Sequence, residues 1–242
     1  MSKGLFADGR QAAVSLSFDD ARASQVKVGL DVLAEHDLKA SFYVQPGPVG
    51  QCIEGWRRAM AAGHEIGNHT IHHPCTGNFC WARAHALEDY TLDQMEAELL
   101  EANRRIEQIL GVTPRTFAYP CGQTFVGRGV ALKSYVPLVA GHFLAGRGYV
   151  GQVANAPEFC DLAQVCAFGS DGQSFESLRA LIEDAIAGGT WVIFAGHEIG
   201  EDGTMTTSAS ALRELGAYLR GRAADVWVDT VAAVAEHIRD HR

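Results

Sequence analysis

The chain has 242 residues, 47% of them hydrophobic and 20% charged, and its formal net charge is −9 at pH 7. This length suits one large α/β domain or two small ones, and it supplies enough apolar residues for a substantial core. The acidic balance, without any block of Lys or Arg, argues against a nucleic-acid-binding surface and against binding to an anionic membrane.

Neither a membrane span nor a secretory signal is visible. No apolar run approaches the roughly 18 residues of a spanning helix, and residues 1–10 include Lys3, Asp8 and Arg10 instead of a hydrophobic signal region. We therefore expect a cytoplasmic protein, or a secreted or periplasmic one whose signal has been removed. The six cysteines are too few for a disulfide-built scaffold, so we expect reduced, buried thiols. The alternative is that Cys75 and Cys80 pair with each other or with Cys121.

The first half of the chain alternates predicted strands and helices. Residues 12–18 read as a buried strand that ends at Asp19 and Asp20, and residues 24–36 have apolar residues at helical spacing. Residues 40–44 form a second predicted strand, stopped by two prolines, and residues 53–62 a helix that ends before Gly63.

The clearest helix begins at a capping box, in which Thr91 is followed three residues later by Gln94, and runs to Leu110 before Gly111. Residues 115–119 read as a short strand. The segment 123–172 is rich in glycine and hard to assign, with one or two apolar strands expected around residues 136–139.

The last third returns to a regular pattern. It predicts a helix over 175–187, a strand over 191–195 that leads to His197, a helix over 209–220, a strand over 226–228 and a closing helix over 230–239. Strands that alternate with helices favour a parallel sheet covered by helices, either a barrel or a doubly wound sheet. No linker divides the chain, so we expect one domain over residues 1–242.

Four of the ten histidines fall within residues 63–74. His69 and His73 are four residues apart, and on a helical turn they would share one face and reach a single ion. Two imidazoles with one carboxylate are a common ligand set for a catalytic divalent metal, whereas the structural alternative is a pair of surface or core histidines. The pentapeptide Gly-His-Glu-Ile-Gly occurs at 63–67 and again at 196–200, and because no similarity extends beyond it we favour convergence over duplication.

Chemically active side chains follow three of the predicted strands. Asp19-Asp20, Cys121-Gly122 and His197 each stand at a carboxyl end, where parallel α/β folds place their sites. A pair of acids at a strand end can also be a turn or a helix cap. Adjacent carboxylates repel unless a cation lies between them, however, and His69 and His73 would complete a metal site.

Four short segments at or near predicted strand ends stand out in chain order: Ser17-Phe18-Asp19-Asp20, His69-Thr70-x-x-His73, Phe117-Ala118-Tyr119-Pro120-x-Gly122 and Ile193-Phe194-x-x-His197. In this order they resemble the motifs of the polysaccharide deacetylase family (carbohydrate esterase family four). The resemblance implies a distorted (β/α) barrel with about seven parallel strands. It also implies a metal-dependent enzyme that removes acetyl groups from chitin-like, peptidoglycan or xylan substrates.

The resemblance implies a role for each matched residue. Zn²⁺, or a similar divalent ion such as Co²⁺, would be held by Asp20, His69 and His73. A metal-activated water would lose its proton to Asp19 as general base, and the backbone N–H of Cys121 would stabilise the oxyanion. His197 would protonate the leaving amine or alkoxide, provided that a carboxylate raises its pKa.

Two departures from the family pattern stand out. The third motif usually begins with an arginine that pairs with the base, and here that position is Ala118. Arg115, Arg128 and Arg147 are the candidates to replace it. The fourth motif, an acid followed by tryptophan, is absent, and Asp171 is the nearest candidate to orient His197, although Asp171-Gly172 also reads as a simple turn.

Some neighbouring residues have two interpretations. His72 competes with His73 as a ligand, and the family register favours His73. The aromatic residues Phe79, Trp81 and Tyr119 would either line a sugar-binding face or pack in the core.

We predict a metal-dependent deacetylase acting on an N- or O-acetylated sugar. The absent arginine and the absent signal motivate a second hypothesis, hydrolysis of a small non-carbohydrate amide or ureide at the same site. A third hypothesis is a catalytically silent carbohydrate-binding protein, which would not need Asp19 or His197. The sequence does not indicate the oligomeric state.

Overall fold

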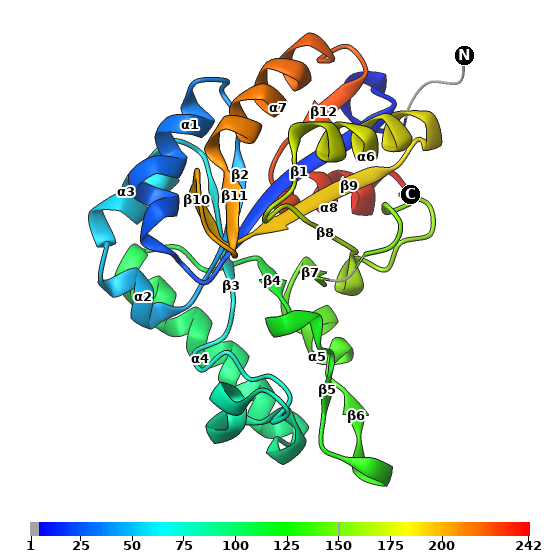
Figure 1. Ribbon diagram of the computed structural model, residues 1–242. Coiled ribbons are helices and arrows are strands. Elements are labelled where there is room, and N and C mark those ends of the chain that lie inside the picture. The colour runs from blue at the N-terminus through cyan, green and yellow to red at the C-terminus, as the bar shows by residue number, and fades with distance from the viewer. Residues whose placement is uncertain (1–4, 150) are drawn as a thin grey trace.

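The computed structural model describes residues 5–149 and 151–242. Residues 1–4, part of the N-terminal segment in which we expect no secretory signal, lie outside the described residues. The centre is a sheet of parallel strands in the order β7-β4-β3-β2-β1-β9-β8, with β12 paired to the amino end of β1 (Figure 1). The strands are β1 (Ala12–Asp19), β2 (Ala40–Val44), β3 (Glu65–Asn68), β4 (Thr116–Ala118), β7 (Ala145–Arg147), β8 (Phe168–Gly169), β9 (Trp191–Gly196) and β12 (Val226–Val228).

The two ends of this sheet meet. A parallel bridge joins Arg147 of β7 to Val165, and three residues later the same segment enters β8, which pairs with β9. Because residues 165–169 contact a strand on each side, the seven strands of the main path close into a barrel. The predicted distorted (β/α) barrel with about seven parallel strands is confirmed.

Helices surround the barrel, and two small strand pairs extend from it (Figure 1). The helices are α1 (Leu30–Ala34), α2 (Pro46–Gly50), α3 (Ile53–Ala61), α4 (Leu92–Leu110), α5 (Val136–His142), α6 (Phe175–Gly188), α7 (Ala209–Gly221) and α8 (Val231–His241). The small pairs are β5 (Phe125–Val126) with β6 (Lys133–Ser134), and β10 (Glu198–Gly200) with β11 (Thr206–Ser208). Among the described helices, none combines the length and apolar character needed to cross a bilayer.

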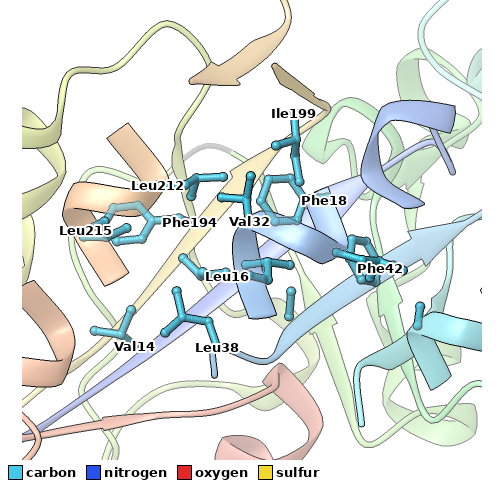
Figure 2. Close-up of a cluster of buried hydrophobic side chains, with 14 of the residues drawn as sticks. Val14, Leu16, Phe18, Val32, Leu38, Phe42, Phe194, Ile199, Leu212 and Leu215 are labelled. Carbon is cyan, nitrogen blue, oxygen red and sulfur yellow. The ribbon is translucent and has the colours of Figure 1, made fainter. Parts of the chain in front are cut away.

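Side-chain alternation along β1 separates the core from the site. Val14, Leu16 and Phe18 point outward and pack with residues of α1 and α7, as Figure 2 shows for Val32, Leu212 and Leu215. The odd-numbered residues point the other way, since successive side chains of a strand face opposite sides. Ala13 accordingly belongs to a second cluster, with β9 and α8. Asp19 continues this odd-numbered face, and it is therefore buried although it is charged.

Most predicted elements are confirmed. The capping box at Thr91 is formed, and Gly111 ends α4 in the left-handed conformation, with φ 75°. The strands expected around residues 136–139 are wrong, because this segment is α5. Pro137 lies in its first turn, where a missing N–H costs nothing. Val136 and Val139, three apart, both face the core, which is a helical spacing.

Candidate active site

The first group of the site lies where β1 ends. Asp19 is the last residue of the strand, and Asp20 and Ala21 follow it in the left-handed region, with φ 72° and 52°. This backbone is costly for residues other than glycine. The turn directs two consecutive carboxylates into one pocket, at the carboxyl end of the barrel.

Asp20 meets both predicted histidine ligands. Its Oδ1 is 3.5 Å from Nε2 of His69 and 3.5 Å from Nε2 of His73, and the candidate ligand atoms of the three residues all lie within 4.8 Å of one another. The Nδ1–H of His69 donates to the carbonyl oxygen of Ala118, at 2.9 Å, which leaves its Nε2 lone pair facing Asp20. The predicted convergence of these three side chains is thus present.

The two histidines do not share a helical turn, so that part of the prediction is wrong. Thr70 and His73 have φ values of 65° and 52°, and the segment after β3 is an irregular loop. In this loop, side-chain oxygens accept hydrogen bonds from the backbone N–H groups in place of the carbonyl oxygens of a helix. Asn68 accepts from the N–H of Thr70, whose hydroxyl accepts from the N–H of His73, and Glu98 accepts from the N–H groups of residues 71 and 72.

His73, not His72, faces the acidic residues, as the family register indicated. The Nδ1–H of His72 donates to Glu98, at 2.9 Å, and the ring stacks on that of His85. Burial, followed by the charge of His69, lowers the pKa of His73 to about 4, so its imidazole is neutral near pH 7. Burial alone would raise the pKa of Asp20, but His69, His73 and Arg22 outweigh burial and lower it.

This donor set fits a divalent cation. Neutral imidazole nitrogen and carboxylate oxygen are ligands that Zn²⁺ and similar borderline ions accept. The lowered pKa values of His73 and Asp20 keep these two side chains in the protonation state that binding requires. Three protein ligands also leave coordination positions open, as catalytic rather than structural zinc sites do.

Arg147 supplies the cation that the third motif lacks. Its guanidinium donates to Oδ1 of Asp19, and the exposed fractions of the two residues are 0% and 3%. The guanidinium also lies over the ring of Tyr43, 5.0 Å from its centroid. Arg147 of β7 is the direct register partner of Ala118 of β4, the position where the family motif carries its arginine. The charge therefore comes from the adjacent strand at the same level of the barrel.

The other two candidates are excluded by their positions. Arg115 pairs with Glu236 and Arg128 with Asp89, and all four side chains are exposed.

We expect Arg147→Met to lower the free energy of unfolding of the metal-free protein by about 3–5 kcal/mol, because it leaves Asp19 buried without a partner. Arg115→Met is the matched control, and loss of its exposed ion pair is expected to cost less than about 1 kcal/mol. Urea unfolding of both variants makes the comparison. Equal effects of the two substitutions would contradict a buried ion pair at Asp19.

His197 follows β9 and is oriented by Asp171. Its Nδ1–H donates to Oδ2 of Asp171 at 2.5 Å, and its backbone N–H donates to Oδ1. Thr207 also donates to Asp171. Burial acts to lower the pKa of His197, but the bond to Asp171 and the charges of Asp19 and Asp171 outweigh it, so the pKa is raised. Asp171 is thus more than a turn residue, and His197 is suited to hold a proton.

A general acid must be protonated, so activity that depends on His197 declines as pH rises through its pKa. We expect Asp171→Asn to move this alkaline decline to lower pH, because the hydrogen bond and charge that raise the pKa are removed. The pH profile of kcat/KM for the variant and the parent protein tests this. An unchanged alkaline limb would show that a different group controls it.

Cys121 occupies the turn after β4. It is left-handed, with φ 53°, and lines the same pocket as the acids and histidines. Its sulfur, that of Cys75 and a ring nitrogen of His73 form a second cluster within 4.8 Å. Of the two interpretations of Tyr119, a sugar-binding face or core packing, the structure supports core packing. It is buried, and its hydroxyl donates to the carbonyl oxygen of Ala163, so it belongs to the core.

The pocket that contains these groups has a volume of about 970 Å³. Phe79 and Trp81 stand at its edge, with ring centroids 5.3 Å apart and planes inclined by 21°, and Trp81 is 62% exposed. The centroid of the His73 ring is 5.6 Å from that of Trp81. Two apolar rings are therefore presented to solvent next to the candidate metal ligands.

Two further residues that shape the site, Glu98 and Tyr149, were not predicted from the sequence. Glu98 lies on the buried face of α4 and holds the histidine loop, and Tyr149 lines the pocket beside His197. A signal existed for Glu98, because its spacing from Met95 and Ala102 places an acid on the apolar face of an amphipathic helix. Tyr149 lies in the glycine-rich segment, where the sequence gives no periodic signal.

The fold and the pocket define an α/β barrel that gathers carboxylates and imidazoles at the carboxyl ends of its strands. The family model described as Polysaccharide deacetylase matches residues 7–129, about half of the chain. The chain therefore belongs to the polysaccharide deacetylase family, a family of hydrolases, as the motifs indicated.

Curated relatives are similar over part of their length. Peptidoglycan-N-acetylglucosamine deacetylase PgdA of Listeria monocytogenes is 28% identical over 127 residues, which are 52% of this chain and 24% of that protein. Chitooligosaccharide deacetylase of Sinorhizobium fredii is 37% identical over 95 residues, 39% of each chain. The matched part of this chain thus spans less than half of the length of these relatives.

A solved structure covers nearly the whole fold. The crystal structure described as that of a "putative polysaccharide deacetylase" from Mycobacterium smegmatis has a TM-score of 0.72 and 20% sequence identity. The alignment covers 97% of this chain and 92% of that one. At this identity the likeness concerns the fold alone.

Proposed function

We propose that this protein is a metal-dependent hydrolase that removes acetyl groups from an N- or O-acetylated carbohydrate. One observation carries the proposal: Asp19, Asp20, His69, His73 and His197 line a single pocket at the carboxyl end of the barrel. The relatives named for peptidoglycan N-acetylglucosamine and chitooligosaccharide support the substrate class.

Asp20, His69 and His73 would hold the cation, Zn²⁺ or a similar ion such as Co²⁺. When bound, that cation supplies Lewis-acid chemistry, which polarises the acetyl carbonyl and makes water more acidic. Asp19 takes the proton of the attacking water, while Arg147 orients its carboxylate and balances its charge.

The remaining groups act on the substrate. The backbone N–H of Cys121 donates to the oxygen that becomes negative as the carbonyl is attacked, a contribution that survives side-chain replacement at this position. His197, held by Asp171, gives a proton to the departing amine or alkoxide oxygen. A base and an acid anchored by separate partners, Arg147 and Asp171, allow the two opposite proton transfers.

Acetate release tests the proposal. The purified protein is incubated with N-acetylglucosamine oligomers, acetylated xylan oligomers and small amides or ureides, with zinc and with a chelator. We expect zinc-dependent acetate release from one of the two sugar classes. Turnover of the amides or ureides alone would favour the small-substrate hypothesis, and sugar binding without turnover would favour a silent binding protein.

The paired rings at the pocket edge lead to a prediction about affinity. Aromatic faces stack on the C–H surfaces of sugars, and removing one such contact worth about 0.5–1.5 kcal/mol raises KM roughly 2- to 13-fold. We expect this increase for Trp81→Ala with an oligosaccharide, with little change in kcat. Phe159→Ala is the control, because Phe159 is exposed but is not a lining residue of this pocket. Equal KM values for the two variants would contradict a sugar platform.

A further inference from the structure

A pair of thiols lies next to His73, one of the candidate metal ligands. The Sγ atoms of Cys75 and Cys121 and a ring nitrogen of His73 are mutually within 4.8 Å, and Cys75 Sγ is 3.6 Å from His73 Nδ1. All six cysteines are free in the described structure. A disulfide bond requires about 2.05 Å between sulfurs, so the two sulfurs need to approach by less than about 3 Å.

The two thiols differ in access. Cys121 lines the pocket and is partly exposed, whereas Cys75 is 0% exposed. A small oxidant that enters the pocket therefore reaches Cys121 first. Cys75 can be reached only by a neighbour, and Cys121 is the neighbouring thiol. This is the arrangement of an attacking and a resolving cysteine.

Both thiols are attached to strained segments of the site. Cys121 has φ 53° and carries the backbone N–H to which we assign oxyanion stabilisation. Cys75 follows His73, which has φ 52°, by two residues, and its sulfur is in hydrogen-bonding range of the His73 ring. Closing a bond between the sulfurs pulls both segments toward each other, and it draws the Cys75 sulfur away from the His73 ring that it contacts.

We propose that Cys75 and Cys121 form a reversible disulfide on exposure to a hydroperoxide, and that this bond disables the adjacent site. The Cys121 sulfur attacks one peroxide oxygen, which breaks the O–O bond and gives a sulfenic acid and water. The Cys75 sulfur then attacks the sulfenic sulfur, a second water leaves, and the S–S bond forms. Two thiols and one hydrogen peroxide thus become one disulfide and two waters. A dithiol reductant reverses the change.

The chemical step and its consequence are tested separately, because only the loss of turnover rests on the proposed function. Reduced protein is treated with hydrogen peroxide, and non-reducing peptide mapping follows the products. We expect an intact mass lower by two hydrogens and a cross-linked pair of peptides that contain Cys75 and Cys121. The link should be absent from Cys121→Ser, should persist in Cys80→Ser, and should disappear with dithiothreitol.

Three results would overturn the assignment. The first is oxidation of the two thiols to separate acids, and the second is a link from either thiol to Cys80. The third is uptake by the reduced protein of a second zinc ion that blocks the link, which would assign His73, Cys75 and Cys121 to a metal centre instead. Zinc released from the loaded protein on oxidation, and retained by Cys121→Ser, reports the effect on the site without an activity assay.

Discussion

The His69→Ala variant is expected to lose bound zinc and acetate release together. His69 is 1% exposed, its Nδ1–H donates to the carbonyl oxygen of Ala118, and its Nε2 faces Asp20. The ring is therefore fixed in place, and we expect no neighbouring side chain to take over its role as a ligand. Lewis-acid stabilisation is worth several kcal/mol, and each 1.4 kcal/mol is tenfold in rate. The expected loss of kcat/KM is on the order of 10³-fold or more. Metal analysis after gel filtration, alongside acetate release, measures both.

The matched control for this variant is His142→Ala. His142 pairs with Glu96 on α4, and it is not a lining residue of the pocket, so zinc and activity should be unchanged. Circular dichroism and thermal unfolding separate loss of metal from loss of fold. Full zinc occupancy in a folded His69→Ala protein would end the assignment of His69 as a ligand.

The Asp19→Asn variant should separate chemistry from metal binding. The amide is similar in size to the carboxylate but is not a base, so we expect kcat to fall by about 10²- to 10⁴-fold while zinc is retained. Loss of the buried ion pair with Arg147 also lowers stability, so turnover is measured below the onset of unfolding.

Two controls make this result interpretable. Zinc content shows whether the proposed ligands Asp20, His69 and His73 still bind the cation, and the KM for substrate shows whether the pocket is intact. If kcat stays close to that of the parent protein, the base is another group, and Asp19 serves only to neutralise Arg147.

The sequence was sufficient for the strand ends and not for the loops between them. Asp19, Cys121 and His197 lie at or just after the ends of strands that the apolar pattern predicts, and parallel topology alone brings such positions to one end of a barrel. No comparable rule of topology predicts the conformation of the loop from His69 to His73. It depends on side chains distant in sequence, above all Glu98, so a helical turn was the wrong inference from the four-residue spacing.

The glycine-rich middle of the chain shows the same limit. Valines at 136 and 139 favoured a strand by composition, whereas Pro137 and the three-residue spacing favour the helix α5 that forms. Arg147 could be named as a candidate partner of Asp19 but not chosen from three. The choice rests on the register of β4 with β7, which no local pattern encodes.

Pairing of Ala118 with Arg147 has a consequence for how relatives of this chain diverge. The two positions are cross-strand neighbours, and only one guanidinium is needed to balance the single carboxylate of Asp19. In an alignment of the family, sequences with arginine at one of these two positions should have a small residue at the other. The two positions should therefore covary, with the arginine present at only one of them in each sequence. Mixed lineages with arginine at both would require a second buried anion.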